Sequence, residues 1–390
     1  MKIGHFIDHI TAFIVVLVPL SSSLSQNYHT PTCSTVSSKR HLFIFGLAGN
    51  VGSKIAQECI LSSYFDSVVG TVRACNTGTQ FGLGIPLEEH NRAEIQGFLS
   101  NATHVLVTIP PIPIQADDDK KKMNITYQNI ILDNQNDDGK EYSKYIRPGT
   151  WVGFVSTTGV YGDHAGGWVN ESSDTRALVG SKVKAFLDHE EQWQQRATEG
   201  DFDMFIFRCA GLYSSSASAL HTVYWNIRKH GQEVGIPSAA EAVTEATVES
   251  FTSRIHIDDV ARAIISSMNM HMSYIENQGS LPSTNSAQVY NLADDEPAPR
   301  SQVMAYARDI LASNQDLDEI LNYREQSLER NGSSNMRSSE RSRRRSRENK
   351  KVQNTKMKED LLPDRKLIFP TYREGLTFIL KDSIPFKKPL

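Results

Sequence analysis

The amino-acid sequence predicts an α/β protein with a doubly wound parallel sheet and a smaller C-terminal lobe. Two observations carry this prediction. From His41 onward, short apolar runs alternate with segments of helical periodicity, and a glycine-rich turn directly follows the first apolar run. Successive parallel strands need a crossover connection, usually a helix, so strands that alternate with helices favour a parallel sheet. After Ser214 the alternation weakens, which favours a second, smaller lobe.

The apolar runs and helical segments can be placed in order along the chain. The first run, "HLFIF" (41–45), contains aromatic residues and ends at a glycine, as expected for a buried strand. The same criteria predict strands over 67–73, 104–109, 150–157 and 203–210, and helices over 51–63, 88–101, 125–134 and 183–197. We expect the segments 253–268 and 287–297 to contribute to the same sheet. Right-handed crossovers place the carboxyl ends of such strands at one edge, where ligands bind.

A glycine motif occupies the turn between the first predicted strand and the following helix. The stretch "FGLAGNVGSK" (45–54) has three glycines spaced as GxxGxxG. They permit a tight turn and a close approach of the backbone to a pyrophosphate, and the helix N-terminus adds free N–H groups with partial positive charge. The motif therefore predicts a Rossmann-type NAD(P) site. Its predicted cofactor residues are Gly46, Leu47, Gly49, Asn50, Val51 and Gly52.

The end of the second predicted strand indicates which dinucleotide binds. NAD sites of this kind usually place an acidic residue there, about 20 residues after the glycines, to bind the ribose 2′-hydroxyl. Here the strand ends "GTVR", with Arg73 at its tip and no acid. A guanidinium at this position suits the 2′-phosphate of NADP. We therefore expect NADP, with NAD as an alternative; the other interpretation of Arg73 is an arginine merely exposed on a loop.

These features divide the chain into four parts. We expect a signal and transit leader over 1–38 and an NAD(P)-binding domain over 39–213, whose sheet is completed by about 253–295. A substrate lobe would comprise 214–252 and 296–390, interrupted by a disordered basic insertion over 324–350. The arginine- and serine-rich insertion has a second interpretation, as a nucleic-acid or partner-binding segment.

The first residues resemble a targeting signal rather than part of a fold. The apolar run "ITAFIVVLVPL" (10–20) is too short to span a bilayer but suits a signal peptide. The stretch after it is rich in Ser and Thr, and no acid occurs between Asp8 and Glu58, as in two-part plastid leaders. We expect delivery to a plastid, with the secretory pathway as the alternative and no membrane attachment of the mature form.

Composition excludes some classes of function. The net charge of −4 argues against a generic nucleic-acid binder, so we expect a small-molecule substrate and no nucleic-acid partner. The cysteines do not have metal-binding spacing, and no metal is expected. They are Cys33, Cys59, Cys75 and Cys209.

Taken in order, several segments resemble the extended short-chain dehydrogenases/reductases of the NAD-dependent epimerase/dehydratase superfamily, and within it the YeeZ-like subgroup. The resemblance covers about 41–320 and about 350–380 and implies a Rossmann domain with a C-terminal substrate lobe. It also implies cofactor contacts at Ile109 and Pro110 and places Asp258 and Asp259 where a following helix would be capped. The segments are "GLAGNVG", "GTVR", "VTIPP", "WVGFVSTTGVYGD", "FRCAGLYS", "SRIHIDDVARAI", "VYNLADDEPAP" and "PTYREGL".

The resemblance also indicates where catalytic groups would lie. In the superfamily a Ser or Thr shortly before "VYG" orients the substrate. The Tyr of a YxxxK pair is the general acid/base, and the Lys lowers its pKa and holds the ribose. Here Ser156 and Thr157 occupy the hydroxyl positions and Lys182 matches the lysine, so these three are the predicted catalytic residues. The tyrosine position holds Leu178, which cannot exchange a proton; the YeeZ-like subgroup usually lacks this tyrosine.

The missing tyrosine leaves two functions open. One is an NADP-dependent oxidoreductase or epimerase/dehydratase that acts on a small organic substrate, with Asp163, His164 or Lys184 as another acid. The other is a non-catalytic NADP-binding redox sensor or scaffold. If the alignment of this segment with the superfamily is shifted by two residues, Lys184 takes the role given to Lys182. In either case we expect Leu178 to contact the nicotinamide as an apolar side chain.

Overall fold

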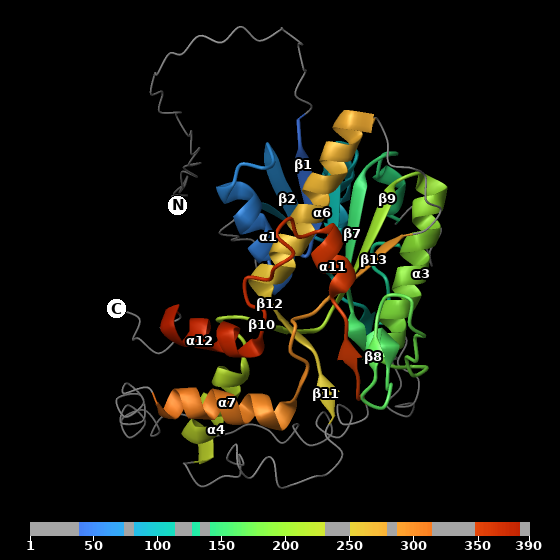
Figure 1. The fold of residues 1–390 in the computed structure, drawn as a ribbon. Coiled ribbons are helices and arrows are strands. Elements are labelled where there is room, and N and C mark those ends of the chain that lie inside the picture. The colour runs from blue at the N-terminus through green and yellow to red at the C-terminus, as the bar shows by residue number, and fades with distance from the viewer. Residues whose placement is uncertain are drawn as a thin grey trace, which may run out of the picture. The chain divides into compact units, whose positions relative to one another are not determined.

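The fold is seen in the computed structural model of Figure 1, which describes residues 39–73, 82–113, 127–132, 141–230, 250–278, 287–313 and 348–382. The predicted leader and most of the predicted basic insertion lie outside these residues. Within the described ranges, no helix has both the length and the apolar character needed to cross a membrane.

A seven-stranded sheet forms the centre of the structure, and all of its strand pairs are parallel. This confirms the predicted fold class. The order places β1 in the interior, with chain-successive strands on each side, as in doubly wound folds. Across the sheet the strands are β13 (Gln288–Leu292), β9 (Asp203–Cys209), β7 (Trp151–Thr157), β4 (His104–Val107), β1 (His41–Phe45), β2 (Ser67–Val72) and β3 (Leu83–Pro86).

Helices cover both faces of this sheet because successive side chains of a strand point to opposite faces. Leu42 and Ile44 of β1 belong to one core, with α1 (Asn50–Leu61) and α6 (Ile257–Gln278) packed over it. Phe43 and Phe45 belong to the core on the other face, which α2 (Arg92–Leu99) and α3 (Lys182–Gly200) cover. Figure 1 shows α1 and α6 in front of the sheet. The single-turn helices are η1 (Glu89–Asn91), η2 (Ser143–Tyr145) and η3 (Thr158–Tyr161).

A smaller lobe has its own apolar core, in which Leu220, Val303 and Tyr372 are buried. It is built from α4 (Ala219–His230), α7 (Arg300–Ala312) and α12 (Tyr372–Asp382), below the sheet in Figure 1. The short helix α11 is Thr355–Asp360. Short strand pairs complete the described chain: β10 (Gly211–Tyr213) with β12 (Arg254–His256), β11 (Phe251–Thr252) with β14 (Ala298–Pro299), β8 (Trp168–Val169) with β15 (Lys351–Val352), and β5 (Ile112–Pro113) with β6 (Tyr127–Gln128).

The helix predicted over 125–134 is wrong where the structure describes it. β6 occupies Tyr127–Gln128, and a turn follows. The Asn129 side-chain oxygen accepts hydrogen bonds from the backbone N–H groups of Ile131 and Leu132, each at 3.3 Å. An Asn side chain that bonds to nearby backbone in this way competes with helix formation.

The predicted basic insertion ends earlier than its sequence suggested. Residues 348–350 are described, and the backbone oxygen of Asn349 accepts hydrogen bonds from the N–H groups of His164 (3.0 Å) and Gly166 (2.9 Å). The Asn349 side-chain oxygen accepts a third, from Phe251 N at 2.9 Å. The insertion therefore ends before Glu348, and the chain that follows is part of the fold.

A buried histidine at the amino edge of the sheet predicts acid sensitivity. His104 has 0% of its surface exposed, and burial, followed by the nearby His271, lowers its pKa to about 3. The unfolded chain takes up this proton near pH 6.5, so the folded state loses stability as pH falls from about 6.5 toward 3. We expect the free energy of unfolding to fall by roughly 1.4 kcal/mol per pH unit below pH 6 from this residue alone.

Urea denaturation between pH 7 and pH 5 checks this expectation. His104→Phe should have a shallower pH dependence, because phenylalanine keeps the ring contacts with Phe65 and Trp151 and takes up no proton. The free energy of unfolding of His104→Phe should still depend on pH, since burial also lowers the pKa of His189, to about 4. An unchanged slope in His104→Phe would show that other groups cause the acid sensitivity.

Candidate functional site

The glycine turn lies at the carboxyl end of β1 and is tightly closed. Gly46 has φ +92°, a left-handed conformation that favours glycine, and its oxygen accepts a hydrogen bond from Gly49 N at 2.9 Å. A Cβ atom on Gly52 would lie 2.3 Å from that oxygen, so the turn can close only with glycine at position 52. The buried side chains of Leu47 and Val51 anchor the loop in the core.

Two threonines brace this turn from the neighbouring strands. Thr71 of β2 accepts a hydrogen bond from Gly46 N at 3.1 Å. The Thr108 hydroxyl, just after β4, lies 2.9 Å from Phe45 O and 3.2 Å from Gly46 O and donates to them. Sequence reasoning missed both roles, although both threonines lie in the segments "GTVR" and "VTIPP" that carried the resemblance.

The N-terminus of α1 is open to an anion. Its N-cap, Gly49, provides no side-chain hydrogen bond, and no acidic residue occupies the first turn. Asn50, the first residue of the helix, is exposed. Free N–H groups and the helix dipole therefore face the space above the turn without a competing carboxylate from the first turn of α1, an arrangement that suits phosphate groups. These residues fit the pyrophosphate of a dinucleotide.

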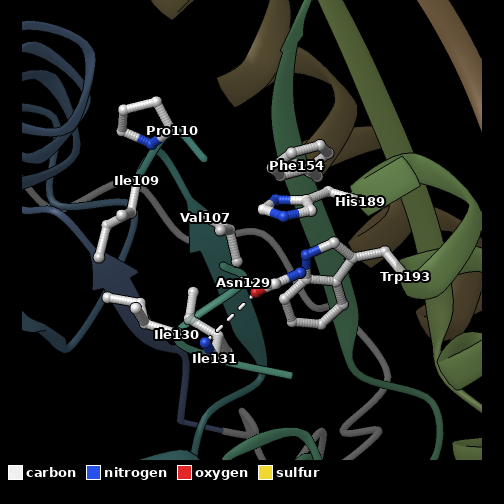
Figure 2. A pocket seen from close by; sticks show the side chains of 9 residues that line it. All are labelled: Val107, Ile109, Pro110, Asn129, Ile130, Ile131, Phe154, His189 and Trp193. Atoms are coloured by element: carbon white, nitrogen blue, oxygen red, sulfur yellow. Dashed lines mark hydrogen bonds between the residues drawn. The ribbon is translucent and has the colours of Figure 1, made fainter. Parts of the chain in front are cut away.

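The remaining predicted cofactor residues lie at the same edge of the sheet. Arg73 follows β2 directly and is exposed. Ile109 and Pro110 follow β4, the strand next to β1. Both also line a hollow between β4 and α3, shown in Figure 2, where His189 and Trp193 reach from α3 toward Asn129. That hollow is too small for a dinucleotide, with room for about one water molecule.

Thr157 and the start of α3 meet at η3. The Thr157 side chain accepts a hydrogen bond from Gly159 N at 3.1 Å and so caps η3. A Cβ atom on Gly159 would lie 3.3 Å from both Thr157 Oγ1 and Val183 Cγ2, which places the first turn of α3 beside this hydroxyl. β7 is two strands from β1, so Thr157 lies about 10 Å across the sheet edge from the glycine turn. Its hydroxyl hydrogen has no acceptor within the described chain.

The two lysines of α3 differ in their surroundings. Lys184 is paired with Asp188, and this contact raises its pKa. Lys182 is exposed, lies 5.9 Å from the centroid of the Phe186 ring, and pairs with no carboxylate of the described residues. Of the two, Lys182 therefore remains the amine that can bind a ligand. Leu178 is 71% exposed on the loop before α3, where an apolar ligand surface could cover it.

Ser156 belongs to the core instead of the site. Its side chain is buried and donates a hydrogen bond to Glu190, a buried residue of α3. Glu190 forms an ion pair with Arg208 of β9, at 2.7 Å from Nη2 and 3.2 Å from Nε. The structure therefore leaves Thr157 as the predicted hydroxyl that can reach a ligand, because a serine held by a buried carboxylate cannot also orient a substrate.

The same network immobilises Tyr161, the tyrosine of "VYG". The Tyr161 hydroxyl donates to Asn291 Oδ1 at 2.7 Å and accepts from Arg208 Nη1 at 3.0 Å. Burial raises its pKa, so it is a weaker acid than an ordinary tyrosine. Tyr161 therefore does not replace the tyrosine missing at position 178.

The loop after η3 holds the other proposed acids in structural contacts. Asp163 Oδ1 accepts hydrogen bonds from the backbone N–H groups of Ala165 and Asn349. The His164 ring lies 3.2 Å from the backbone oxygen of Asp174. With Lys184 paired as well, Lys182 is the one candidate proton-exchanging group near Thr157 that the described contacts leave open.

Asp258 and Asp259 lie in the first turn of α6, the helix that the resemblance places them beside, but their carboxylates bind partners outside that helix. Asp259 is 1% exposed and accepts hydrogen bonds from the backbone N–H groups of Ile368 and Phe369, which lead into α12. Asp258 pairs with Lys54 of α1 at 2.8 Å. These carboxylates therefore join separate segments, one of them leading into the smaller lobe, because each finds a backbone or ammonium donor outside its own helix.

Comparison with known proteins identifies the architecture. Similar solved structures include a conserved protein of unknown function from Silicibacter pomeroyi DSS, 23% identical with a TM-score of 0.58, which covers 88% of this chain and 99% of its own. Another is UDP-glucose 4-epimerase from Thermotoga maritima with UDP-glucose, 15% identical, TM-score 0.53, covering 87% and 97%. A third is MoeE5 in complex with UDP-glucose and NAD, 14% identical, TM-score 0.52, with the same coverage.

This chain has the fold of the NAD-dependent epimerase/dehydratase proteins. No protein-family model matches the sequence, and no curated protein does. The resemblance predicted from the motifs is thus confirmed for the superfamily fold, while the YeeZ-like subgroup stays a prediction. Within the epimerase/dehydratase fold, the described residues contain no group of three or more His, Cys, Asp or Glu side chains arranged to hold a metal ion.

Proposed function

We propose that this chain binds NADP and acts as an oxidoreductase or epimerase/dehydratase on a small organic substrate. The observation that carries the proposal is the glycine turn below an uncapped, acid-free helix N-terminus. A bound nicotinamide would supply the hydride chemistry. The chain itself would hold the pyrophosphate at the N-terminus of α1, orient the substrate with the Thr157 hydroxyl, and hold the ribose with Lys182.

Nucleotide sugars are the first substrate class to test. The Thermotoga maritima and MoeE5 structures were determined with UDP-glucose, and MoeE5 also with NAD. Each alignment covers 87% of this chain, and the shared fold supports a substrate of similar chemistry. Leu178 leaves the enzyme without the usual acid, so we expect slow turnover in which Lys182 or a substrate group exchanges the proton.

Arg73 should decide the choice of dinucleotide. A charge-assisted hydrogen bond from its guanidinium to the 2′-phosphate is worth about 1.5–3 kcal/mol, so Arg73→Ala should weaken NADPH binding roughly 10- to 150-fold. NADH lacks that phosphate, and its affinity should change little. Calorimetry on both dinucleotides checks this. Arg262→Ala removes a remote surface guanidinium, paired with Asp364 at 2.8 Å, and should change neither affinity. Equal losses for NADPH and NADH in Arg73→Ala would contradict the assignment.

Two substitutions should separate substrate orientation from cofactor binding. Thr157→Val should lower turnover by about 100-fold, which is the lower end of what one positioned catalytic side chain contributes, and leave NADPH affinity unchanged. Lys182→Ala should weaken both turnover and NADPH binding, because the amine would also hold the ribose. Purified protein is assayed with NADPH or NADP against nucleotide-sugar, aldehyde and quinone panels. NADPH binding without turnover of any panel member would favour a sensor or scaffold over an enzyme.

A further inference from the structure

Gly46 lies just beyond the backbone ladders of the sheet. The pairing of β1 with β2 ends at Phe45 and Thr71, and the pairing of β1 with β4 ends at Phe45 and Val107. At Gly46 the chain takes φ +92° and turns toward α1, so strand pairing no longer fixes its orientation. That orientation therefore depends on other contacts, because glycine has more backbone freedom than other residues.

Hydroxyl groups from the two neighbouring strands hold the backbone of Gly46 on both sides. Thr71 Oγ1 accepts a hydrogen bond from Gly46 N at 3.1 Å, and Thr108 Oγ1 donates toward Gly46 O at 3.2 Å. The Thr108 hydroxyl also lies 2.9 Å from Phe45 O, so its single hydrogen is shared between two successive carbonyl groups. With these side chains, the two threonines extend the strand pairing one residue beyond the ladders.

The position of Gly46 O decides how the turn meets α1. This oxygen accepts a hydrogen bond at 2.9 Å from the N–H group of Gly49, the N-cap of α1. The Thr108 hydroxyl packs closely on the turn, since a Cβ atom on Gly46 would lie 2.6 Å from Thr108 Oγ1. Threonine is β-branched and therefore stiff at χ1. A stiff donor at this point fixes Gly46 O, and through it the start of α1.

Thr108 can be changed without leaving a carbonyl group unpaired. Phe45 O also accepts from Thr108 N at 3.0 Å, and Gly46 O also accepts from Gly49 N. Valine has nearly the shape of threonine and lacks the hydroxyl, so Thr108→Val removes only the third contact of the turn. Thr108 is also half-buried just after β4, whereas Thr71 is 1% exposed within β2.

We propose that Thr108 is a positioning residue of the dinucleotide site. Its hydroxyl group holds Gly46 O so that the N–H groups at the N-terminus of α1 share the direction that the pyrophosphate needs. Thr108 acts through the turn, without touching the ligand, and a turn that is already ordered binds more tightly than one that the ligand must order. The inference rests on the proposed function for the identity of that ligand.

Calorimetry with NADPH on the whole protein tests the effect on affinity. Thr108→Val should weaken NADPH binding roughly 3- to 10-fold, the range expected for the loss of one hydrogen bond. Thr108→Ser restores the hydroxyl donor without the methyl group, and its affinity should lie within about twofold of that of the unaltered chain.

Thr150→Val is the matched control. Thr150 is also a buried threonine whose hydroxyl donates to a backbone carbonyl, that of Ala102 at 3.4 Å. It precedes β7, at the opposite edge of the sheet from the glycine turn. A merely structural role of threonine hydroxyls would affect both variants alike, whereas positioning predicts that Thr150→Val binds NADPH as tightly as the unaltered chain.

Hydrogen exchange on the ligand-free chain tests the turn itself. The Gly49 N–H group donates to Gly46 O, so its exchange should be roughly 3- to 10-fold faster in Thr108→Val and unchanged in Thr150→Val. The inference is overturned if Gly49 exchanges at the same rate in Thr108→Val, if this variant binds NADPH as tightly as the unaltered chain, or if Thr108→Ser does not recover the affinity.

The outcomes separate this inference from the proposed function. If the unaltered chain binds NADPH and Thr108→Val binds it equally well, the role of Thr108 is wrong and the proposed function stands. If the unaltered chain does not bind NADPH, both are wrong, because Thr108 then has no dinucleotide to position.

Discussion

Replacing Arg208 by methionine is expected to lower the free energy of unfolding by about 3–5 kcal/mol. The substitution leaves the Glu190 carboxylate buried, at 3% exposure, without its cationic partner. It also removes the donor 3.0 Å from the Tyr161 hydroxyl. Breaking one side of a buried ion pair costs far more than the pair contributes, because an isolated charge in the interior cannot be solvated.

Urea denaturation at neutral pH measures this loss. Arg262→Ala breaks an ion pair in which both side chains are substantially exposed, and should cost no more than about 1 kcal/mol. Replacing both Glu190 and Arg208 by methionine should recover much of the lost stability, since no buried charge then remains. If Arg208→Met and Arg262→Ala lose similar amounts, the buried network does not hold the sheet and α3 together as its geometry implies.

The second large effect is expected at the glycine turn. Gly52→Ala should weaken NADPH binding by about 100-fold or more, which is about 2.7 kcal/mol. The new Cβ atom would lie 2.3 Å from Gly46 O and 3.2 Å from Leu47 Cα, so the turn and the first turn of α1 must move apart. The N–H groups that would receive the pyrophosphate then lose their common direction.

Two other glycines make this a graded experiment. Gly49→Ala brings a Cβ atom only to 3.1 Å from Gly46 O, and we expect a smaller loss of affinity. Gly97 lies within α2, and a Cβ atom added there would meet no described atom within 4 Å apart from its own helix backbone and chain neighbours. Gly97→Ala should therefore stabilise the protein by up to about 1 kcal/mol without changing NADPH affinity. Calorimetry gives the affinities, and circular dichroism confirms that each variant is folded. If Gly52→Ala and Gly97→Ala bind NADPH with equal affinity, the pyrophosphate does not bind at the N-terminus of α1.

The clearest sequence signals were local ones. The five strands predicted between 41 and 210 are present as β1, β2, β4, β7 and β9, because runs of apolar residues must be buried wherever they occur. It was harder to predict where a side chain competes with the backbone hydrogen bonds of a helix. The segment 125–134 has helical periodicity, but the Asn129 side chain bonds to the backbone two and three residues later and forms a turn in place of a helix.

By itself, the sequence determined the parallel sheet and the glycine turn, because burial of apolar runs and the backbone freedom of glycine act over a few residues. Only the tertiary structure decided which site residues are free to act. Ser156 and Thr157 are adjacent and chemically alike, yet Glu190, 34 residues away, binds the first and leaves the second at the sheet edge. Tyr161 is held by Asn291, 130 residues further along the chain. Such partners come together only when the core closes, because a buried polar group needs whichever donor or acceptor the fold places beside it.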